Sequence, residues 1–344
     1  MSITAIVVVA VLLVLLSGVV YQQLGLRRDR RRVPPPGTLV VVGGRRMHVF
    51  TLGTGTPPVV FESGIAASSL NWTAVQREVS PIASASTYDR AGYGWSDPAP
   101  GAVNASTACD RLRTVLAAAS IAPPYLLVGH SFASYILQLY ACRHPGEIAG
   151  MVLVDPITHE DWRAPGPDRR RTLQGGVLFS RVGALVAASG LLRLLLSRLE
   201  GGSPGAGRAV LRSFGPAATA AVTGIVGQVG KMPREVWPAI RTHWSRPTGF
   251  LTMARYFATL PESARQVEAE VSAAPPWPFP LIVLTGERSE SDVERHRRLA
   301  ARSLRGTHVV VSGTGHWIHL DAPEAVVGAI EEVLARARAE AAAP

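Results

Sequence analysis

Residues 125–134 read YLLVGHSFAS, and this stretch decides the fold. An apolar run leads into Gly129 and a helical pattern follows, so the stretch predicts a strand, a sharp turn and a helix with Ser131 at the apex. Strand and helix nearly touch at such a turn, which requires the small residues found here at Gly129 and Ala133. The pattern therefore predicts a serine whose hydroxyl projects above a sheet, with the Phe132 amide beside it. The alternative is a serine that caps an ordinary helix.

Strands and helices are expected to alternate on both sides of this turn. Two short β-rich runs, at 39–42 and 47–52, indicate an antiparallel hairpin. Strands that alternate with helices predict a mostly parallel sheet flanked by helices, with ligands at the carboxyl ends of the strands. The strand candidates after the hairpin are 58–62, 83–88, 124–128, 150–154, 281–285 and 308–311.

The alternation stops near Pro156 and resumes at Pro280. A structureless loop of that length is implausible inside a compact domain, so residues 156–279 are predicted to form a helical cap over the strand ends. The core that the cap interrupts then has two parts, residues 37–155 and residues 280–340. Aromatic stripes in the cap are interpreted as core packing rather than ligand contacts.

The N-terminus carries an uncharged apolar run from Ile3 to Tyr21, about the length that spans a membrane as a helix. Residues 1–24 are therefore predicted to be a transmembrane anchor, and residues 25–36 a basic, Pro-rich linker. The arginines that follow the apolar run favour a single-pass protein with its folded domain in the cytoplasm. A cleaved export signal is the alternative.

Composition excludes some partner classes. The formal net charge is +10 over 344 residues, but basic residues do not form a stripe interleaved with aromatics, so we expect no nucleic-acid partner. The two cysteines, Cys109 and Cys142, are too few for a disulfide scaffold and are interpreted as buried thiols. No metal or organic cofactor is predicted.

A candidate general base lies near the C-terminus. His316 occupies the glycine-flanked turn GTGHW, between the last predicted strand and the last predicted helix. A serine hydroxyl is a weak nucleophile near neutral pH and needs an adjacent base to take its proton. A histidine after the last strand fits the chain order of serine, acid and histidine in this topology. His319 and His130 are less suitable, because one approaches a helix and the other is constrained by the turn itself.

Six stretches together resemble the α/β-hydrolase fold family, of the lipase and esterase type with a cap. The resemblance covers residues 37–340 and implies that Ser131 is the nucleophile, that His316 is the general base, and that the backbone amides of Ile65 and Phe132 form the oxyanion hole. The stretches are FESGIAASSLNW (61–72), YDRAGYGWSDP (88–98), LVGHSFAS (127–134), LVDP (153–156), PLIVLTGE (280–287) and GTGHWIHLDAPE (313–324).

The acid of the triad departs from the family pattern. Such families often place it three residues after the glycine equivalent to Gly286, where this chain has Ser289. Asp155 is the favoured candidate, because it ends a predicted strand at the carboxyl edge and is rigidly supported. Glu290 lies on a looser loop, and Asp292 begins a helix, where an acid is expected simply to complement the helix dipole.

The sequence and the resemblance thus predict a membrane-anchored serine hydrolase that acts on a small-molecule or lipid-like carboxylic ester with a hydrophobic acyl group. The same residues are compatible with perhydrolase or haloperoxidase-type, amidase or lyase chemistry, because this fold hosts many reactions. A serine at position 131 argues against dehalogenase and epoxide hydrolase chemistry, which use aspartate there. A non-catalytic, membrane-tethered binding protein is the alternative from another class.

Overall fold

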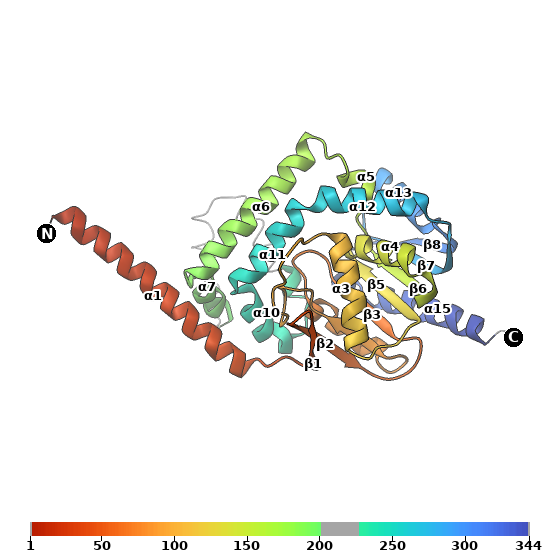
Figure 1. The fold of residues 1–344 in the computed structure, drawn as a ribbon, viewed down its shortest axis with the longest axis horizontal. Coiled ribbons are helices and arrows are strands. Elements are labelled where there is room, and N and C mark those ends of the chain that lie inside the picture. Colours follow the sequence, from red (N-terminus) through yellow and green to blue (C-terminus); the bar gives the residue numbers. More distant parts are fainter. Residues whose placement is uncertain (1, 201–226, 343–344) are drawn as a thin grey trace.

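The computed structural model describes residues 2–200 and 227–342. A sheet in the order β1-β2-β4-β3-β5-β6-β7-β8 forms its centre (Figure 1). β1 and β2 form the antiparallel hairpin and β2 pairs antiparallel with β4, whereas all later pairs are parallel. The strands are β1 Thr38–Val42, β2 Arg45–Leu52, β3 Val59–Glu62, β4 Ala85–Tyr88, β5 Tyr125–His130, β6 Ile148–Val154, β7 Trp277–Thr285 and β8 Ser303–Val310.

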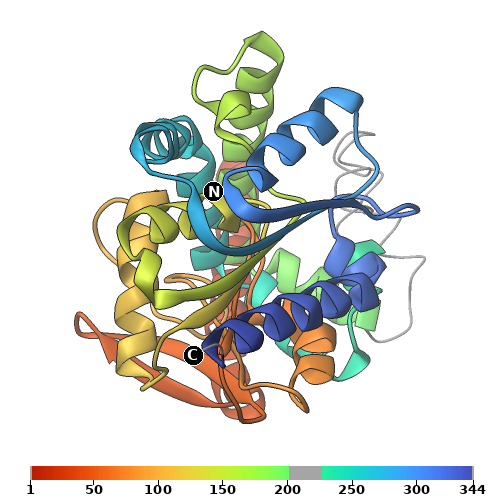
Figure 2. The ribbon, with the colours of Figure 1, turned by 90° about the vertical axis from the view of Figure 1, so that its right-hand side faces the viewer.

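Both faces of the sheet are covered by helices, as Figures 1 and 2 show. Leu127 of β5 packs with α3 and α4 on one face, while its neighbours Leu126 and Val128 pack with α2 and α15 on the other. Because successive side chains of a strand point to opposite faces, a strand buried on both faces is apolar throughout. The helices of the core are α2 Thr73–Val79, α3 Ala105–Ala118, α4 Ala133–Arg143, α13 Glu290–Ala300, α14 Ile318–Asp321 and α15 Pro323–Ala341.

The predicted cap segment, residues 156–279, falls between β6 and β7 in the chain, except that β7 already begins at Trp277; the described part between the two strands is mostly helical. Residues 201–226 of the expected cap lie outside the described residues. Its last helix packs back on the core, because Ala264, Val267 and Val271 join the same apolar cluster as α3 and α4. The helices are α5 His159–Trp162, α6 Pro167–Ala188, α7 Leu191–Glu200, α10 Trp237–Trp244, α11 Pro247–Ala258 and α12 Leu260–Ala273.

A single long helix, α1 (Ile3–Arg32), precedes the domain, and its N-terminal part projects away from it (Figure 1). An 18-residue window of α1 has a mean hydropathy of 3.1 and is not buried, so α1 is a candidate membrane span. The sequence predicted an anchor ending at residue 24 and a linker from residue 25, but the helix continues to Arg32. The exposed arginines Arg30 to Arg32 follow the apolar run without interrupting the helix, since arginine is a good helix former.

Candidate active site

The turn between β5 and α4 places Ser131 at the carboxyl edge of the sheet. Ser131 has a φ of 57°, in the left-handed region that is strained for a residue with a side chain. A Cβ on Gly129 would lie 2.6 Å from the Leu137 side chain and 3.1 Å from the Ala133 Cβ. The strand and the helix therefore approach as closely as the sequence pattern predicted, and a larger residue at either position would separate them.

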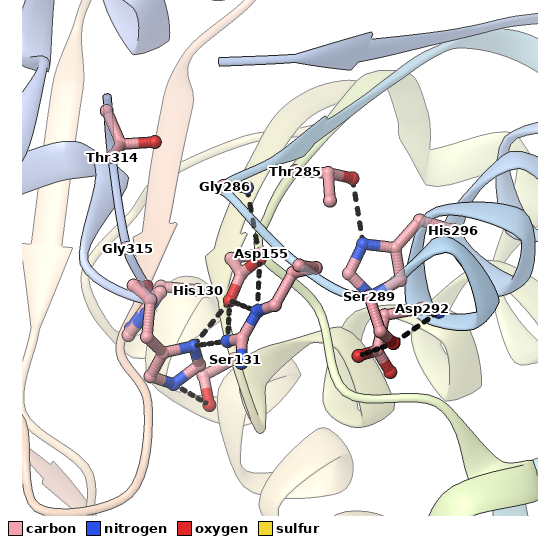
Figure 3. Close-up of polar contacts among 12 residues, drawn as sticks. His130, Ser131, Asp155, Thr285, Gly286, Ser289, Asp292, His296, Thr314 and Gly315 are labelled. Carbon is pink, nitrogen blue, oxygen red and sulfur yellow. Dashed lines mark hydrogen bonds and ion pairs between the residues drawn. The ribbon is translucent and has the colours of Figure 1, made fainter. Parts of the chain in front are cut away.

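Ser131 and His316, far apart in the chain, are hydrogen-bonded. The Ser131 Oγ lies 2.9 Å from His316 Nε2, and the other ring nitrogen, Nδ1, lies 2.6 Å from Asp155 Oδ2 (Figure 3). With a proton on Nδ1, the imidazole donates to the carboxylate and its Nε2 accepts from the serine hydroxyl. This is the geometry in which a serine can give its proton to a base whose tautomer is fixed by an acid.

The structure brings Asp155, and neither Asp292 nor Glu290, to the histidine. Asp155 follows β6, its side chain is fully buried, and one carboxylate oxygen accepts a hydrogen bond from the Gly286 amide at 3.2 Å. Asp292 instead binds Ser289 and Arg295 at the start of α13, away from the imidazole (Figure 3). Glu290 is exposed at the first position of the same helix.

Burial alone would raise the pKa of Asp155, because a carboxylate is poorly solvated inside the protein. Hydrogen bonds from His316 and Arg288, and the positive charges of these groups, outweigh that cost and hold the pKa at about 2. Asp155 is therefore ionised at neutral pH, as it must be to stabilise an imidazolium.

Arg288 is a residue of this site that the sequence analysis missed. Its guanidinium forms an ion pair with Asp155, and one of its nitrogens lies 2.8 Å from His316 Nδ1. While Nδ1 donates to the carboxylate it cannot accept from Arg288, so the neutral imidazole and the Arg288 guanidinium both donate to Asp155. The only available signal was position: Arg288 lies two residues after Gly286, at the same edge of the sheet.

The two other histidines beside this site are structural. His130 is buried, and its Nε2 donates to the His316 backbone oxygen at 2.8 Å, which helps to fix the loop that carries His316. Burial lowers the pKa of His130 well below its ordinary value, and it lowers that of His319 to about 3. His319 packs against Trp72 and His130 and is fully buried. Neither ring faces the serine as a base.

The expected oxyanion-hole residues lie around Ser131. Ile65 and Phe132 line the same cavity as the serine, and in the described part of the chain neither amide donates a hydrogen bond to another group. Gly64 allows the close approach, because a Cβ there would lie 3.2 Å from the Ser131 Cβ. Arg90 holds this loop: it donates to the Gly64 carbonyl at 2.6 Å and pairs with buried Glu62 at 2.6 Å.

The comparisons with known proteins agree with this fold. The family model described as "alpha/beta hydrolase fold" matches residues 57–323. The chain belongs to the α/β hydrolase fold family.

Individual relatives of this α/β hydrolase are distant or partial. An uncharacterized protein of Bacillus subtilis, YqjL, is 39% identical over 98 residues, which are 28% of this chain and 39% of that protein. The matched stretches span less than half the length of the curated relatives.

Two solved structures match most of the α/β hydrolase chain. A thermophilic esterase from Thermogutta terrifontis matches with a TM-score of 0.57 and 20% identity, over 87% of this chain and 97% of the esterase. A protein from Pseudomonas aeruginosa, provisionally assigned as an epoxide hydrolase, matches with a TM-score of 0.64 and 18% identity, over 89% and 98%. At this level of sequence identity, the structural similarity establishes a shared fold.

A cavity of about 830 Å³ extends from Ser131 and His316 between the core of the α/β hydrolase and its cap segment. Its walls are mostly apolar. The cap aromatics were expected to be core packing, but some of them line this cavity. Helices α6 and α11 lie at the edge of the cavity, so the same helix face contacts both the core and the empty space. The cap residues that line it include Leu173, Phe179, Trp244, Phe250, Met253 and Phe257.

The described residues contain no group of three His, Cys, Asp or Glu side chains that could hold a metal ion. Cys109 and Cys142 are free thiols. The hydrogen-bonded pair of Ser131 and His316 at this cavity supports proton transfer between a hydroxyl and an imidazole.

Proposed function

We propose that this chain is a membrane-anchored serine hydrolase that cleaves carboxylic esters with a hydrophobic acyl group. One observation carries the proposal: Ser131, His316 and Asp155 form a hydrogen-bonded chain, with links of 2.9 and 2.6 Å, at an apolar cavity. A hydrogen-bonded base and a buried acid are what a serine needs to act as a nucleophile.

The first half of the reaction forms an acyl-enzyme. Ser131 Oγ attacks the ester carbonyl carbon and gives its proton to His316 Nε2, while Asp155 stabilises the imidazolium. The amides of Ile65 and Phe132 donate to the negatively charged carbonyl oxygen. The tetrahedral intermediate collapses when the bond to the alcohol oxygen breaks and His316 returns the proton to the departing alcohol.

The second half releases the acid. A water molecule gives a proton to His316 as its oxygen attacks the acyl carbon, and the same amides hold the new oxyanion. The bond to Ser131 Oγ then breaks, and the serine takes the proton back. Each group ends in its starting protonation state.

The choice of an ester rests on the nucleophile and on the cavity. Epoxide and haloalkane opening in this fold begins with a carboxylate at the position that Ser131 occupies here. The apolar lining of the cavity matches an acyl chain, because transfer of each CH₂ group from water to such a site contributes about 0.8 kcal/mol.

The test is a panel of p-nitrophenyl esters of increasing acyl length, from acetate to palmitate, with the full chain purified in detergent. We expect kcat/KM to rise with acyl length until the cavity is full, and Ser131→Ala to remove the turnover. A matched p-nitroanilide separates esterase from amidase activity. Absence of turnover of every ester by the intact chain would contradict the proposal.

We further propose that α1 keeps the hydrolase domain on the cytoplasmic side, because exposed arginines follow its apolar run. A reporter fused after Pro344 tests the orientation. A cytosol-dependent fluorescent reporter should be bright there. Active alkaline phosphatase at the same position, with no fluorescence, would show the opposite orientation.

A further inference from the structure

The C-terminal part of α1 is fixed to the cap segment by buried polar contacts. Asp29 pairs with Arg193 of α7 at 2.6 Å, and their side chains are only 5% and 7% exposed. Arg193 also donates to the Gln22 amide oxygen at 2.8 Å, and the Gln22 nitrogen donates to the Ser245 carbonyl at 2.7 Å. A buried charge is stable only with its partner, so this end of α1 is part of the folded domain.

A close crossing lies one turn closer to the N-terminus of α1. A Cβ on Gly18 would lie 2.2 Å from the Ser189 carbonyl oxygen, and a Cβ on Gly190 would lie 2.5 Å from the Gly18 oxygen. The backbone of α1 therefore touches the backbone of the corner between α6 and α7. Figure 1 shows α6 reaching α1 at this corner while the remainder of α1 continues outward.

This crossing fixes the depth of the corner relative to any bilayer that α1 enters. Gly18 lies inside the apolar run, four residues before Gln22, which is about 6 Å along a helix. A bilayer that covers the apolar side chains of α1 must also reach Ser189 and Gly190, since these two residues contact α1 at Gly18. Interfacial segments insert to a depth of about 5–10 Å, which matches this position.

The side chains around the corner suit that environment. A surface helix normally has one apolar face, yet α6 buries Leu173, Ala184 and Ala187 and also exposes a second apolar row. The exposed row, with the adjoining face of α7, comprises Leu178 (64% exposed), Val182 (48%), Leu185 (72%), Leu191 (38%) and Leu194 (41%). We call these five side chains the corner patch.

The charges nearby suit a lipid headgroup layer. Arg181 is exposed next to Val182 on α6, and a long arginine side chain can lie along apolar surface while its guanidinium reaches the headgroups. Arg27, Arg28 and Arg30 are exposed on α1 just beyond the apolar run. Basic groups at this level are attracted to anionic lipids.

We infer that the corner patch is a second membrane-inserted element, which lies in the headgroup and acyl boundary of the same bilayer as α1. The cap segment is thereby held on the membrane surface, and the cavity wall formed by the inner face of α6 lies directly behind the inserted face. The inference rests on the proposed anchoring by α1 and is independent of the hydrolytic reaction.

The test measures depth in the bilayer with an NBD fluorophore on single cysteines. The full chain, with Cys109→Ala and Cys142→Ala, is reconstituted into phosphatidylcholine vesicles that contain phosphatidylglycerol and doxyl-labelled lipid. The reporter position is Leu185→Cys. Leu304→Cys on β8 is the matched control, because Leu304 is 75% exposed and β8 lies on the opposite side of the domain from α1 (Figure 1). Leu12→Cys reports the anchor itself.

We expect NBD at position 185 to lose roughly half of its fluorescence or more to the doxyl lipid and to be protected from aqueous iodide, as at position 12. NBD at position 304 should show the reverse. Quenching at position 12 with an iodide-accessible position 185 would overturn the corner patch alone. If NBD at position 185 is shielded from both quenchers, a protein partner, such as a second copy, covers the corner patch. That result would also overturn the inference. An aqueous signal at position 12 would overturn the anchoring as well.

Discussion

The two walls of the cavity are built differently. On the core side, Ser131 and Asp155 follow parallel strands, and each is held in an unusual backbone conformation, with φ of 57° and 41°. Hydrogen bonds of 2.6–2.9 Å join these residues through His316. On the cap side, α6 and α11 contribute one leucine, one methionine and three phenylalanines that contact the cavity without directional bonds.

The difference separates two tasks. Chemistry needs reacting groups that are positioned within a fraction of an ångström, which rigid strand ends and hydrogen bonds supply. Recognition of an acyl chain needs apolar area, whose contribution is roughly proportional to the area removed from water and is not directional. Changes on the core side should therefore alter turnover of every substrate, whereas changes on the cap side should alter selectivity.

The largest effect is expected on the core side at the nucleophile. Ser131→Ala should lower kcat by about four to six orders of magnitude, as removal of a triad member does in other serine hydrolases. Steady-state kinetics on a short ester and on a long ester measure it, and the loss should be equal for both. Activity retained within about tenfold would rule out the mechanism.

The acid should give the next largest effect. Asp155→Asn keeps the shape but not the charge that fixes the His316 tautomer, so kcat should fall by about three to four orders of magnitude. The matched control is Asp292→Asn, which alters an acid bonded to Ser289 and Arg295 and should leave kcat nearly unchanged. The opposite result, with Asp292→Asn inactive and Asp155→Asn normal, would transfer the acid role to α13.

The attachment of the cap segment to α1 should appear in stability. Asp29→Ala leaves Arg193 buried and unpaired, which costs about 3–5 kcal/mol and should lower Tm by roughly 5 °C or more. Asp168→Ala is the control, because that acid is 95% exposed in its ion pair with Arg171 and should change stability by less than about 0.5 kcal/mol. Equal melting curves for both variants in detergent would show that α1 is only a tether.

The smallest effect is expected from the cap wall of the cavity. Phe179→Ala removes apolar contact area, so kcat/KM for a long-chain ester should fall by about tenfold while that for acetate changes little. Leu178→Ala, the outward neighbour on α6, should preserve the ratio between the two esters. An equal loss on both esters with Phe179→Ala would break the division between the two walls.

Much of the core side could be predicted from the sequence. Alternating strands and helices fix where carboxyl strand ends meet, and the small residues around Ser131 report the tight turn directly. The chain order of serine, acid and histidine follows from topology, but Asp155, Glu290 and Asp292 all fit that order. The structure brings Asp155 to His316, which bonds to Ser131. Local pattern and tertiary position agree here because both depend on backbone geometry.

Other features depend on contacts between distant segments, and single-sequence patterns do not contain them. Arg288 reads as one more surface arginine until β7 brings it to Asp155. Ser289 caps α13, although Ser291 lies only two residues further on, and two serines so close cannot be ranked by propensity. The burial of Asp29 depends on α7, more than 160 residues away.

The most direct test of the central claim is covalent labelling by a fluorophosphonate probe, which reacts only with an activated serine. The full chain should be labelled at Ser131, as mass spectrometry of the modified peptide would show, and Ser131→Ala and His316→Ala should remain unlabelled. Heat denaturation before addition of the probe should abolish the labelling of the intact chain. An intact, folded chain that does not react at Ser131 would contradict the account and would leave a membrane-tethered binding protein in its place.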